Sequence, residues 1–252
     1  MNLSERVIII TGAGAGIGLG IARQCREAGA NIVGFDINND GADKLREIGA
    51  EFEQVDVADP DAFGRAIKNV YQQKGHLDGL VNNAGVTIRV PFLDMSHEQM
   101  ETLWAINQRS VLVGCQAAAR IMKTNNGGSI VNIASNHARC TNPGFEGYAG
   151  TKGAVVSMTR AMAWSLGPFK IRVNALCPGM TRTEIVQDAM QDPANEANFR
   201  SWAADNEVNS VEEVGNAAVF LLSSASAALN GADIIADRAM SALLGVMDSR
   251  GK

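Results

Sequence analysis

The chain is poor in residues that bind metal ions or form disulfide bridges. Its three histidines have none of the spacings typical of metal ligands, so we predict no metal site at His76, His97 or His137. The four cysteines are far apart and form no Cys-x-x-Cys motif. We therefore expect free thiols, buried or half-buried, in a reducing compartment, at Cys25, Cys115, Cys140 and Cys177.

The chain also lacks the charge and the long apolar runs of membrane or nucleic-acid binders. Its formal net charge is −5, and a nucleic-acid partner would usually require a basic face. No apolar run reaches the length of a membrane span. The first ten residues, MNLSERVIII, lead directly into glycines and show no pattern of a secretory signal. We expect a cytoplasmic protein with no nucleic-acid partner and no membrane partner.

Aromatic residues are scarce at 5%, whereas the 252 residues include 26 glycines. Such a composition favours close backbone packing and tight turns. Hydrophobic residues make up 46% of the chain and charged residues 19%, an ordinary balance for a globular protein with a substantial core.

Short apolar segments alternate with longer segments of helical periodicity. We predict strands over residues 6–11, 31–36, 51–57, 77–83, 127–135, 170–179 and 231–237. We predict helices over residues 16–29, 41–49, 59–75, 98–124, 147–168 and 210–224, and a loosely helical segment over 183–206. No repeat or low-complexity linker divides the chain. Residues 1–252 are thus predicted to form one doubly wound α/β domain with a parallel sheet of about seven strands.

Glycines follow the first predicted strand, in TGAGAGIG at residues 11–18. In a doubly wound fold, ligands bind at the carboxyl ends of the strands. Glycines there allow a tight turn and a close backbone approach to a pyrophosphate, which the N-terminus of the following helix then faces. The spacing is not Gly-x-Gly-x-x-Gly, but the position between a strand and a helix supports the same function for Gly12, Gly16, Ile17 and Gly18.

Asp36 ends the second predicted strand, eighteen residues after Gly18. A carboxylate there can accept hydrogen bonds from the adenosine ribose and would repel a 2′-phosphate. No Arg or Lys stands at residue 37 or in the glycine-rich loop to receive that phosphate. NAD is therefore favoured over NADP.

Polar or small residues follow the other strands as well. Asp56, next to Val57, could bond the adenine amino group, although a plain turn or cap role is almost as plausible. The fourth strand leads into Asn82, Asn83, Ala84 and Gly85, where a cofactor would cross the sheet or where the amides could simply bond neighbouring backbone. The sixth leads into residues that could hold a nicotinamide amide or a pyrophosphate, namely Pro178, Gly179, Thr181 and Thr183.

Tyr148 and Lys152 are four residues apart in GYAGTKG, residues 147–153, and would share one face of a helix. A neighbouring ammonium would make the phenol proton more labile. Taken alone, the pair could equally be a surface feature. Ser135 ends the fifth strand, thirteen residues before Tyr148.

Together these motifs resemble the short-chain dehydrogenase/reductase family, a Rossmann-type fold. The matching residues span about residues 5–240 and occur in the family's order. They are Thr11-Gly12-x-x-x-Gly16-Ile17-Gly18, Asn82-Asn83-Ala84-Gly85, Asn107, Ser135, Tyr148-x-x-x-Lys152 and Pro178-Gly179. Each motif is weak alone, whereas the ordered set is specific.

The resemblance implies a role for each catalytic position. Tyr148 would be the general acid/base toward a carbonyl or alcohol oxygen. Lys152 would favour proton loss from Tyr148 and hold the nicotinamide ribose. Ser135 would polarise the substrate oxygen, and Asn107 would hold a water that links Lys152 to solvent. Tyr148 and Lys152 would thus contact the cofactor, NAD, as well as the substrate side.

One departure from the family pattern lies near the C-terminus. The family often has Asp-Gly-Gly after the last strand, whereas this chain has Asp237, Arg238 and Ala239, followed by SALLGVMDSRGK. That region commonly packs at subunit contacts in the family, so the exchange bears on the oligomer more than on catalysis. A homotetramer or dimer is the family expectation, with residues 98–124 and 147–167 as interface candidates or, alternatively, as helices that face the core of a monomer.

Polar side chains surround the expected site, among them Arg89, Asn136, His137, Arg139 and Asn142. They favour a small polar or anionic substrate such as a hydroxy acid, a sugar-derived alcohol or a polar cyclic alcohol, unless they point to solvent. Residues 183–206 lie where the family has its substrate lid, with Ile185, Met190, Phe199 and Trp202 as possible contacts. For Trp202, packing on the body is the favoured interpretation.

Three functions compete at this point. The first is an NAD(H)-dependent oxidoreductase that interconverts a secondary alcohol and a ketone. The second is an NADPH-linked 3-oxoacyl-thioester reductase, which Asp36 disfavours. The third is a non-catalytic dinucleotide sensor, which the retained Tyr148 and Lys152 disfavour.

Overall fold

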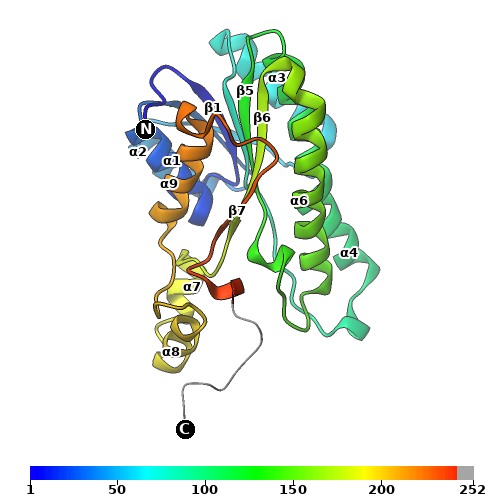
Figure 1. The fold of residues 1–252 in the computed structure, drawn as a ribbon, viewed down its shortest axis with the longest axis vertical. Helices are drawn as coiled ribbons and strands as arrows, with labels where there is room; N and C mark the ends of the chain where they lie inside the picture. Colours follow the sequence, from blue (N-terminus) through cyan, green and yellow to red (C-terminus); the bar gives the residue numbers. More distant parts are fainter. Residues whose placement is uncertain (243–252) are drawn as a thin grey trace.

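A central parallel sheet divides the molecule into two layers of helices (Figure 1). The computed structural model describes residues 1–242. Its seven strands have the order β3-β2-β1-β4-β5-β6-β7, and every neighbouring pair is parallel. The strands are β1 (Val7–Thr11), β2 (Asn31–Asp36), β3 (Glu51–Gln54), β4 (Gly79–Asn82), β5 (Gly128–Ile133), β6 (Ile171–Pro178) and β7 (Asp233–Ala236).

Some of the α-helices cover the two faces of this sheet, and others, such as the pair that follows β6, lie beyond its carboxyl end. The α-helices are α1 (Gly16–Glu27), α2 (Ala42–Glu47), α3 (Pro60–Lys74), α4 (His97–Trp104), α5 (Ser110–Met122), α6 (Glu146–Leu166), α7 (Glu184–Ala189), α8 (Pro193–Ser201) and α9 (Val211–Leu222). Short 3-10 turns occur at Asn39–Gly41, Phe92–Asp94, Asn136–Ala138, Gly167–Phe169, Ser224–Ser226 and Met240–Ala242. The predicted doubly wound fold is confirmed.

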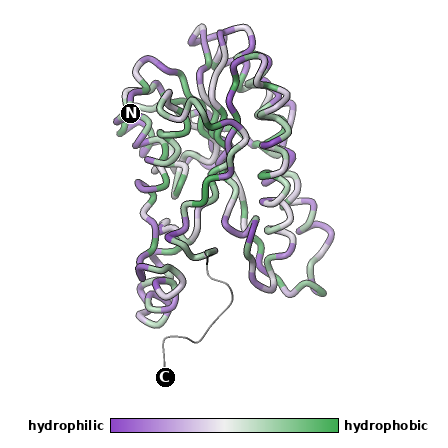
Figure 2. The backbone as a smooth tube through the Cα atoms, in the orientation of Figure 1, coloured by the Kyte–Doolittle hydropathy of each residue, from purple (hydrophilic) through white to green (hydrophobic). Residues whose placement is uncertain are grey.

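Alternation along the strands creates two hydrophobic cores. Val7 and Ile9 of β1 face one core, which includes Phe63 of α3 and residues of α5 and α6. Ile8 and Ile10 face the other core, which is built with α1, α2 and α9. Both faces of a parallel sheet are buried in this way, which explains the continuous apolar sequence of β1. Figure 2 shows the apolar residues concentrated along the central strands.

The strand order reverses between β1 and β4, since β2 and β3 lie on one side and β5 to β7 on the other. The loops that follow β1 and β4 therefore separate and leave a crevice at the carboxyl ends of the strands. The N-terminal end of α6 lies at this same end, as do α7 and α8, which belong to the predicted lid, residues 183–206 (Figure 1). The fold thus brings the strand-end residues of the sequence to one edge.

The predicted helix over 98–124 is wrong as a single unbroken element. It consists of α4, a π-helical segment over Ala105–Arg109, and α5. Such a wide turn adds a residue to the helix and often marks a functional position. Here it contains Asn107, whose side chain is fully buried.

The remaining differences from prediction concern the position at which the third strand ends and the burial of one cysteine. The third strand stops at Gln54 instead of residue 57: Val55 N–H still bonds Asp36 O, and the chain then enters a turn at residues 57–58. All four cysteines are free, and three of them are buried, but Cys140 is exposed, so its predicted burial is wrong. The stretch after residue 242, which the sequence linked to subunit contacts, lies outside the described residues.

Candidate active site

The glycine-rich loop forms a tight turn directly against the end of β4. Gly12 has a φ of +62°, and a β-carbon there would lie 2.9 Å from Ala84 Cα. A β-carbon on Gly18 would lie only 2.0 Å from Gly12 O. Close backbone contact therefore requires glycine at both positions. Ile17 lies half-buried in the first turn of α1 and packs against the hydrophobic core that is built with α1, α2 and α9.

Thr11 and Asn83 hold this loop in place. The Thr11 hydroxyl accepts hydrogen bonds from the Asn83 and Ala84 N–H groups, both at 3.0 Å. The Asn83 side-chain amide donates to the carbonyls of Thr11 and Gly12 at 3.0 and 3.1 Å. The Asn83 side chain thus tethers the two loops on either side of the crevice.

Asp36 extends from the end of β2 to the glycine-rich loop. Its Oδ2 accepts a hydrogen bond of 2.9 Å from Gly14 N–H, and its Oδ1 accepts one of 3.1 Å from Asn38 N–H. The carboxylate is half-buried and held at the mouth of the loop, where a ribose would lie. Asp56 is exposed and bonds Ala58 N–H at 2.8 Å, and Val57 beside it is buried.

Lys152 lies on the second turn of α6 and is only 4% exposed. Its ammonium donates to Ile133 O at 2.9 Å and lies 5.7 Å from the centroid of the Tyr148 ring. Within residues 1–242, no carboxylate forms an ion pair with it. Its hydrogen-bond partner is thus a backbone carbonyl and not a carboxylate, and burial of an ammonium without an anionic partner is costly.

Asn107 approaches the same spot from the π-helical segment. Its side chain bonds both the N–H and the carbonyl of Val86, at 2.8 and 2.9 Å, and donates to Thr151 Oγ1 at 3.3 Å. A β-carbon on Gly85 would lie 3.2 Å from Asn107 Oδ1 and 3.4 Å from Lys152 Nζ. The two side chains therefore converge on Gly85.

Ser135 is buried at the end of β5, beside Asn136. Its hydroxyl accepts a bond of 3.2 Å from His137 N–H and donates to Asn136 Oδ1 at 3.4 Å. Asn136 in turn donates to Asp237 Oδ2 at 3.4 Å. The residue after the last strand thus supports the side chain next to Ser135.

Tyr148 belongs to a cluster of rings. His137 packs with its ring centroid 5.5 Å from that of Tyr148 and 4.7 Å from that of Phe145. The Arg89 guanidinium lies 5.6 Å from the Phe145 centroid. His137 is half-buried, and burial lowers the pKa of its imidazole. His137 thus contacts both residues, Tyr148 through its ring and Ser135 through its backbone N–H.

Arg139 does not join this group in the structure. Its guanidinium bonds Asp233 at the start of β7, and Arg160 bonds the other oxygen of the same carboxylate at 3.1 Å. The Asp233 side chain is only 14% exposed. Burial raises the pKa of Asp233, but the bonds from Arg139 and Arg160 outweigh it and lower the pKa overall. Arg139 thus neutralises a carboxylate at the edge of the sheet, and Asn142 is exposed in the neighbouring loop.

The segment after β6 leads into the lid. Pro178 and Thr181 are buried, and Gly179 packs so closely that a β-carbon would lie 2.6 Å from Asp237 Cβ. Thr183 caps α7 through a bond from Val186 N–H, and its methyl carbon would lie 3.1 Å from a β-carbon on Gly16. The lid therefore starts directly above the glycine-rich loop.

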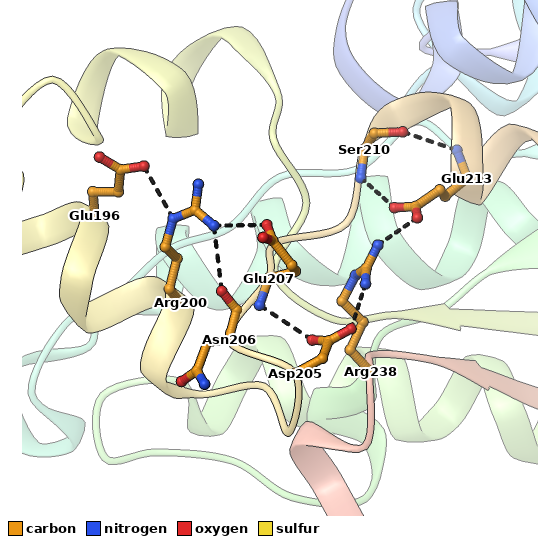
Figure 3. Close-up of polar contacts among 8 residues, drawn as sticks. All are labelled: Glu196, Arg200, Asp205, Asn206, Glu207, Ser210, Glu213 and Arg238. Atoms are coloured by element: carbon orange, nitrogen blue, oxygen red, sulfur yellow. Dashed lines mark hydrogen bonds and ion pairs between the residues drawn. The ribbon is translucent and has the colours of Figure 1, made fainter.

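The lid helices have few buried side chains. Ile185 is 83% exposed and Met190 is buried, whereas Phe199 and Trp202 are half-buried and contact each other with their centroids 5.2 Å apart. Two arginines fix the end of the lid (Figure 3). Arg200 bonds Glu196 and Glu207, and Arg238 bonds Asp205 and Glu213.

The residues present fit a dinucleotide. The N-terminus of α1 already binds a carboxylate, since Gly16 N–H donates to Glu184 Oε2 at 3.1 Å. A helix N-terminus of this kind is suited to a pyrophosphate. Among residues 1–242, no group of three or more His, Cys, Asp or Glu side chains could hold a metal ion, and no helix is long and apolar enough to span a bilayer.

Sequence reasoning missed several residues that this geometry depends on. Asn132 bonds Asn82 at 2.8 Å and Thr159 at 2.9 Å, which joins β4, β5 and α6 through a buried polar contact. The signal for this contact was a single asparagine in each of two apolar strands, Asn82 at the end of β4 and Asn132 between Val131 and Ile133 in β5. Glu184 and Lys44 had no signal, because their positions depend on how the lid and α2 fold back onto the loop.

The fold and the glycine-rich loop define a dinucleotide-binding α/β protein. A model of a family described as enoyl-(acyl carrier protein) reductase matches residues 12–241. The chain belongs to the short-chain dehydrogenase/reductase family of oxidoreductases, as its motifs predicted.

Known proteins similar to the chain cover nearly its whole length. It is 36% identical to carbonyl reductase [NADPH] 2 of Sus scrofa over 240 residues, which are 94% of this chain and 97% of the relative. It is 35% identical to human L-xylulose reductase, over 92% of this chain and 95% of the relative. A solved short-chain type dehydrogenase/reductase from Mycobacterium ulcerans superimposes with a TM-score of 0.92, at 29% identity and with 97% and 93% of the two chains covered. The relatives are alcohol dehydrogenases and carbonyl reductases.

Proposed function

We propose that the protein is an NAD(H)-dependent oxidoreductase that interconverts a secondary alcohol and a ketone on a small polar substrate. The observation that carries this proposal is the buried, carboxylate-free Lys152 beside Tyr148, at the edge where the glycine-rich loop opens. A buried ammonium without an anionic partner is more readily explained by a role in catalysis than by a contribution to stability.

Each residue of the site has a part in the proposed reaction. Tyr148 gives its phenol proton to the carbonyl oxygen during reduction and takes one from the alcohol during oxidation. Ser135 donates a hydrogen bond to the same oxygen and fixes its position. Lys152 holds the nicotinamide ribose next to Tyr148, and Asn107 holds a water through which a proton from solvent reaches the site. The nicotinamide, when bound, supplies or accepts the hydride.

We propose NAD as the cofactor on the strength of Asp36. Its carboxylate is held at the mouth of the glycine-rich loop by Gly14 N–H, where it would bond the ribose hydroxyls and repel a 2′-phosphate. Cofactor contacts are assigned to the loop and to the strand ends. They comprise Gly12, Gly16, Ile17, Gly18, Asp56, Val57, Asn83, Ala84, Gly85, Pro178, Gly179, Thr181 and Thr183, together with Tyr148 and Lys152.

We propose a polar substrate because polar groups frame the ring cluster around Tyr148. Arg89, Asn136 and His137 remain candidate substrate contacts, and residues 183–206 would close over the site as a lid. Arg139 is a weaker candidate than the sequence suggested, because Asp233 occupies its guanidinium. The similarity to an L-xylulose reductase supports a sugar-derived alcohol or ketone.

A second candidate is an NADPH-linked 3-oxoacyl-thioester reductase. The description of the matching family names a reductase of acyl carrier protein substrates, and one relative is named for NADPH. Asp36 is the observation against it. Preferred binding of NADPH by the purified protein would favour this candidate over the first.

We propose that the protein forms a homo-oligomer, a tetramer or a dimer, through α4, α5 and α6. Large apolar side chains are exposed on these helices, with Trp164 88% exposed and Trp104 54% exposed. The free cysteines support a location in a reducing compartment, for which we propose the cytoplasm.

The proposed reaction is tested most sharply by Tyr148→Phe. We expect the loss of one hydroxyl to lower the turnover of polar secondary alcohols with NAD by at least about 10²-fold, the size of one general acid/base contribution. Binding of NADH, followed by nicotinamide fluorescence, should change by less than about twofold, because the ring and Lys152 remain.

The matched control is Tyr71→Phe, since Tyr71 on α3 is the chain's other tyrosine. It should leave turnover unchanged. Full activity of Tyr148→Phe would contradict the proposed role of the phenol.

A further inference from the structure

A carboxylate of the lid occupies the anion position of the glycine-rich loop. Glu184 is the first residue of α7, and its Oε2 accepts the hydrogen bond from Gly16 N–H at 3.1 Å. Gly16 is the first residue of α1, a helix of twelve residues. Under the proposed function, this is the place of the dinucleotide's pyrophosphate.

The electrostatics of this contact favour the charged carboxylate. The pKa of Glu184 is lowered, first by a bond from its own backbone N–H, then by Gly16 N–H and by Lys44, against an opposing effect of partial burial. The partial positive charge at the start of α1 stabilises an anion there. At neutral pH, Glu184 is therefore a negative group at the position that a phosphate would take.

Lys44 completes the arrangement from the other side. Its Nζ lies 3.5 Å from Glu184 Oε1, so one carboxylate joins the loop and this lysine. Lys44 is held near the loop because α2 starts at a very close contact, where a β-carbon on Gly41 would lie 2.2 Å from Gly14 Cα. The Lys44 ammonium therefore lies close to an anion that is bound to Gly16 N–H.

The pair is weak enough to be exchanged. The side chains of Lys44 and Glu184 are 46% and 54% exposed, and exposed ion pairs contribute little to stability. A pyrophosphate carries more charge than one carboxylate and presents several acceptor oxygens. It can therefore replace Glu184 on the loop N–H groups and on Lys44 at the same time.

We propose that Glu184 and Lys44 form an exchangeable charge pair at the cofactor site. Binding of the dinucleotide's pyrophosphate displaces Glu184 from Gly16, transfers Lys44 to the phosphates and frees the first turn of α7. Glu184 thereby lowers cofactor affinity, Lys44 raises it, and the lid responds to the cofactor. The inference rests on the proposed function, since it requires a dinucleotide on this loop.

The test compares dissociation constants for NADH in Glu184→Gln, in the wild type and in a control. We expect Glu184→Gln to tighten NADH binding roughly two- to fivefold, the size of one charge at a helix end. The control is Glu212→Gln. Glu212 lines the same hollow of about 270 Å³, but the bond to Gly16 comes from Glu184. The control should bind NADH as the wild type does.

Lys44→Ala is expected to weaken cofactor binding, which is the opposite of the effect expected for Glu184→Gln. In the Glu184→Gln background, where no carboxylate competes, it should weaken NADH and NADPH binding by a similar factor, because both carry the pyrophosphate. Weakening of NADPH alone would place Lys44 on the 2′-phosphate and overturn its assigned role.

Hydrogen exchange gives a second readout that does not depend on affinity. NADH should speed exchange of the α7 amides in the wild type, and Glu184→Gln should show the faster exchange without NADH. Unchanged or weaker NADH binding by Glu184→Gln, or equal α7 exchange in all states, would overturn the inference. A wild type that binds neither NADH nor NADPH would instead defeat the proposed function.

Discussion

At the scale of single residues, burial separates functional side chains from ordinary surface ones. Lys152 is 4% exposed and Asn107 fully buried, and both point to Gly85. The spacing of Tyr148 and Lys152 predicted that they share a helix face, and their 5.7 Å contact confirms this. Sequence could not show that Arg139 bonds Asp233, because the two residues lie 94 positions apart and meet only when β7 pairs with β6.

His137 allows a prediction about pH. Burial beside Phe145 and Tyr148 lowers its pKa from the ordinary value of 6.5, so the folded protein binds this proton less readily than the unfolded chain. The stability due to this group is complete above pH 6.5 and is lost as the pH falls through that value toward the lower folded pKa.

Denaturant unfolding of the wild type and of His137→Gln between pH 8 and 5 measures the effect. The wild type should lose more free energy of unfolding on acidification than the variant does, since other titrating groups cancel in the comparison. Identical pH dependence in the two proteins would contradict a half-buried imidazole whose pKa is lowered by burial.

At the scale of elements, the structure shows what the residues that replace Gly-Gly after β7 do. Arg238 and Ala239 both adopt positive φ angles, +52° and +64°, in place of glycine. Such angles cost a non-glycine residue about 1 kcal/mol or more. Arg238 offsets this cost by bonding Asp205 of the lid and Glu213 of α9 (Figure 3). The exchanged residue therefore fastens the end of the lid.

Two glycine substitutions at these positions should have different effects. Ala239 is exposed, so Ala239→Gly should raise the free energy of unfolding by about 0.5–1 kcal/mol through relief of strain. Arg238→Gly relieves the strain of a similar φ angle but also removes the two ion pairs of Arg238. It should therefore stabilise the protein less than Ala239→Gly does, or destabilise it. Urea unfolding measures both variants, and equal stabilisation by the two would show that the Arg238 contacts contribute nothing.

The elements themselves were largely predictable, because periodicity and turn residues report local structure. Pro60 after the Asp59 cap and the capping box of Ser210 and Glu213 mark helix starts that the structure confirms. The break around Asn107 was not predictable, since its cause is a set of tertiary bonds from Asn107 to Val86 and Thr151.

At the scale of the whole molecule, exposed apolar side chains on α5 and α6 support self-association. Trp164 is 88% exposed and Leu112 is 44% exposed. Large apolar side chains that are exposed on a folded protein can mark an interface when they gather in one patch. The sequence analysis named these helices either as interface candidates or as helices that face the core, and the solvent exposure of Trp164 and Leu112 favours the first interpretation as a proposal.

Trp164→Glu should therefore shift the protein to the 26.7 kDa monomer in sedimentation velocity at micromolar concentration. The matched control is Ile185→Glu, because Ile185 is 83% exposed but lies on the lid. The control should sediment as the wild type does. A monomeric wild type would contradict the proposed oligomer, and a Trp164→Glu variant that keeps the wild-type mass would contradict the proposed interface.

The central claim is an NAD(H)-dependent oxidoreductase whose cofactor choice depends on Asp36. It is tested most directly by titration of the wild type and of Asp36→Ala with NADH and with NADPH, followed by nicotinamide fluorescence. The account predicts that the wild type binds NADH more tightly than NADPH by at least about tenfold, or 1.4 kcal/mol, and that Asp36→Ala largely removes this preference. Equal or tighter binding of NADPH by the wild type would contradict it.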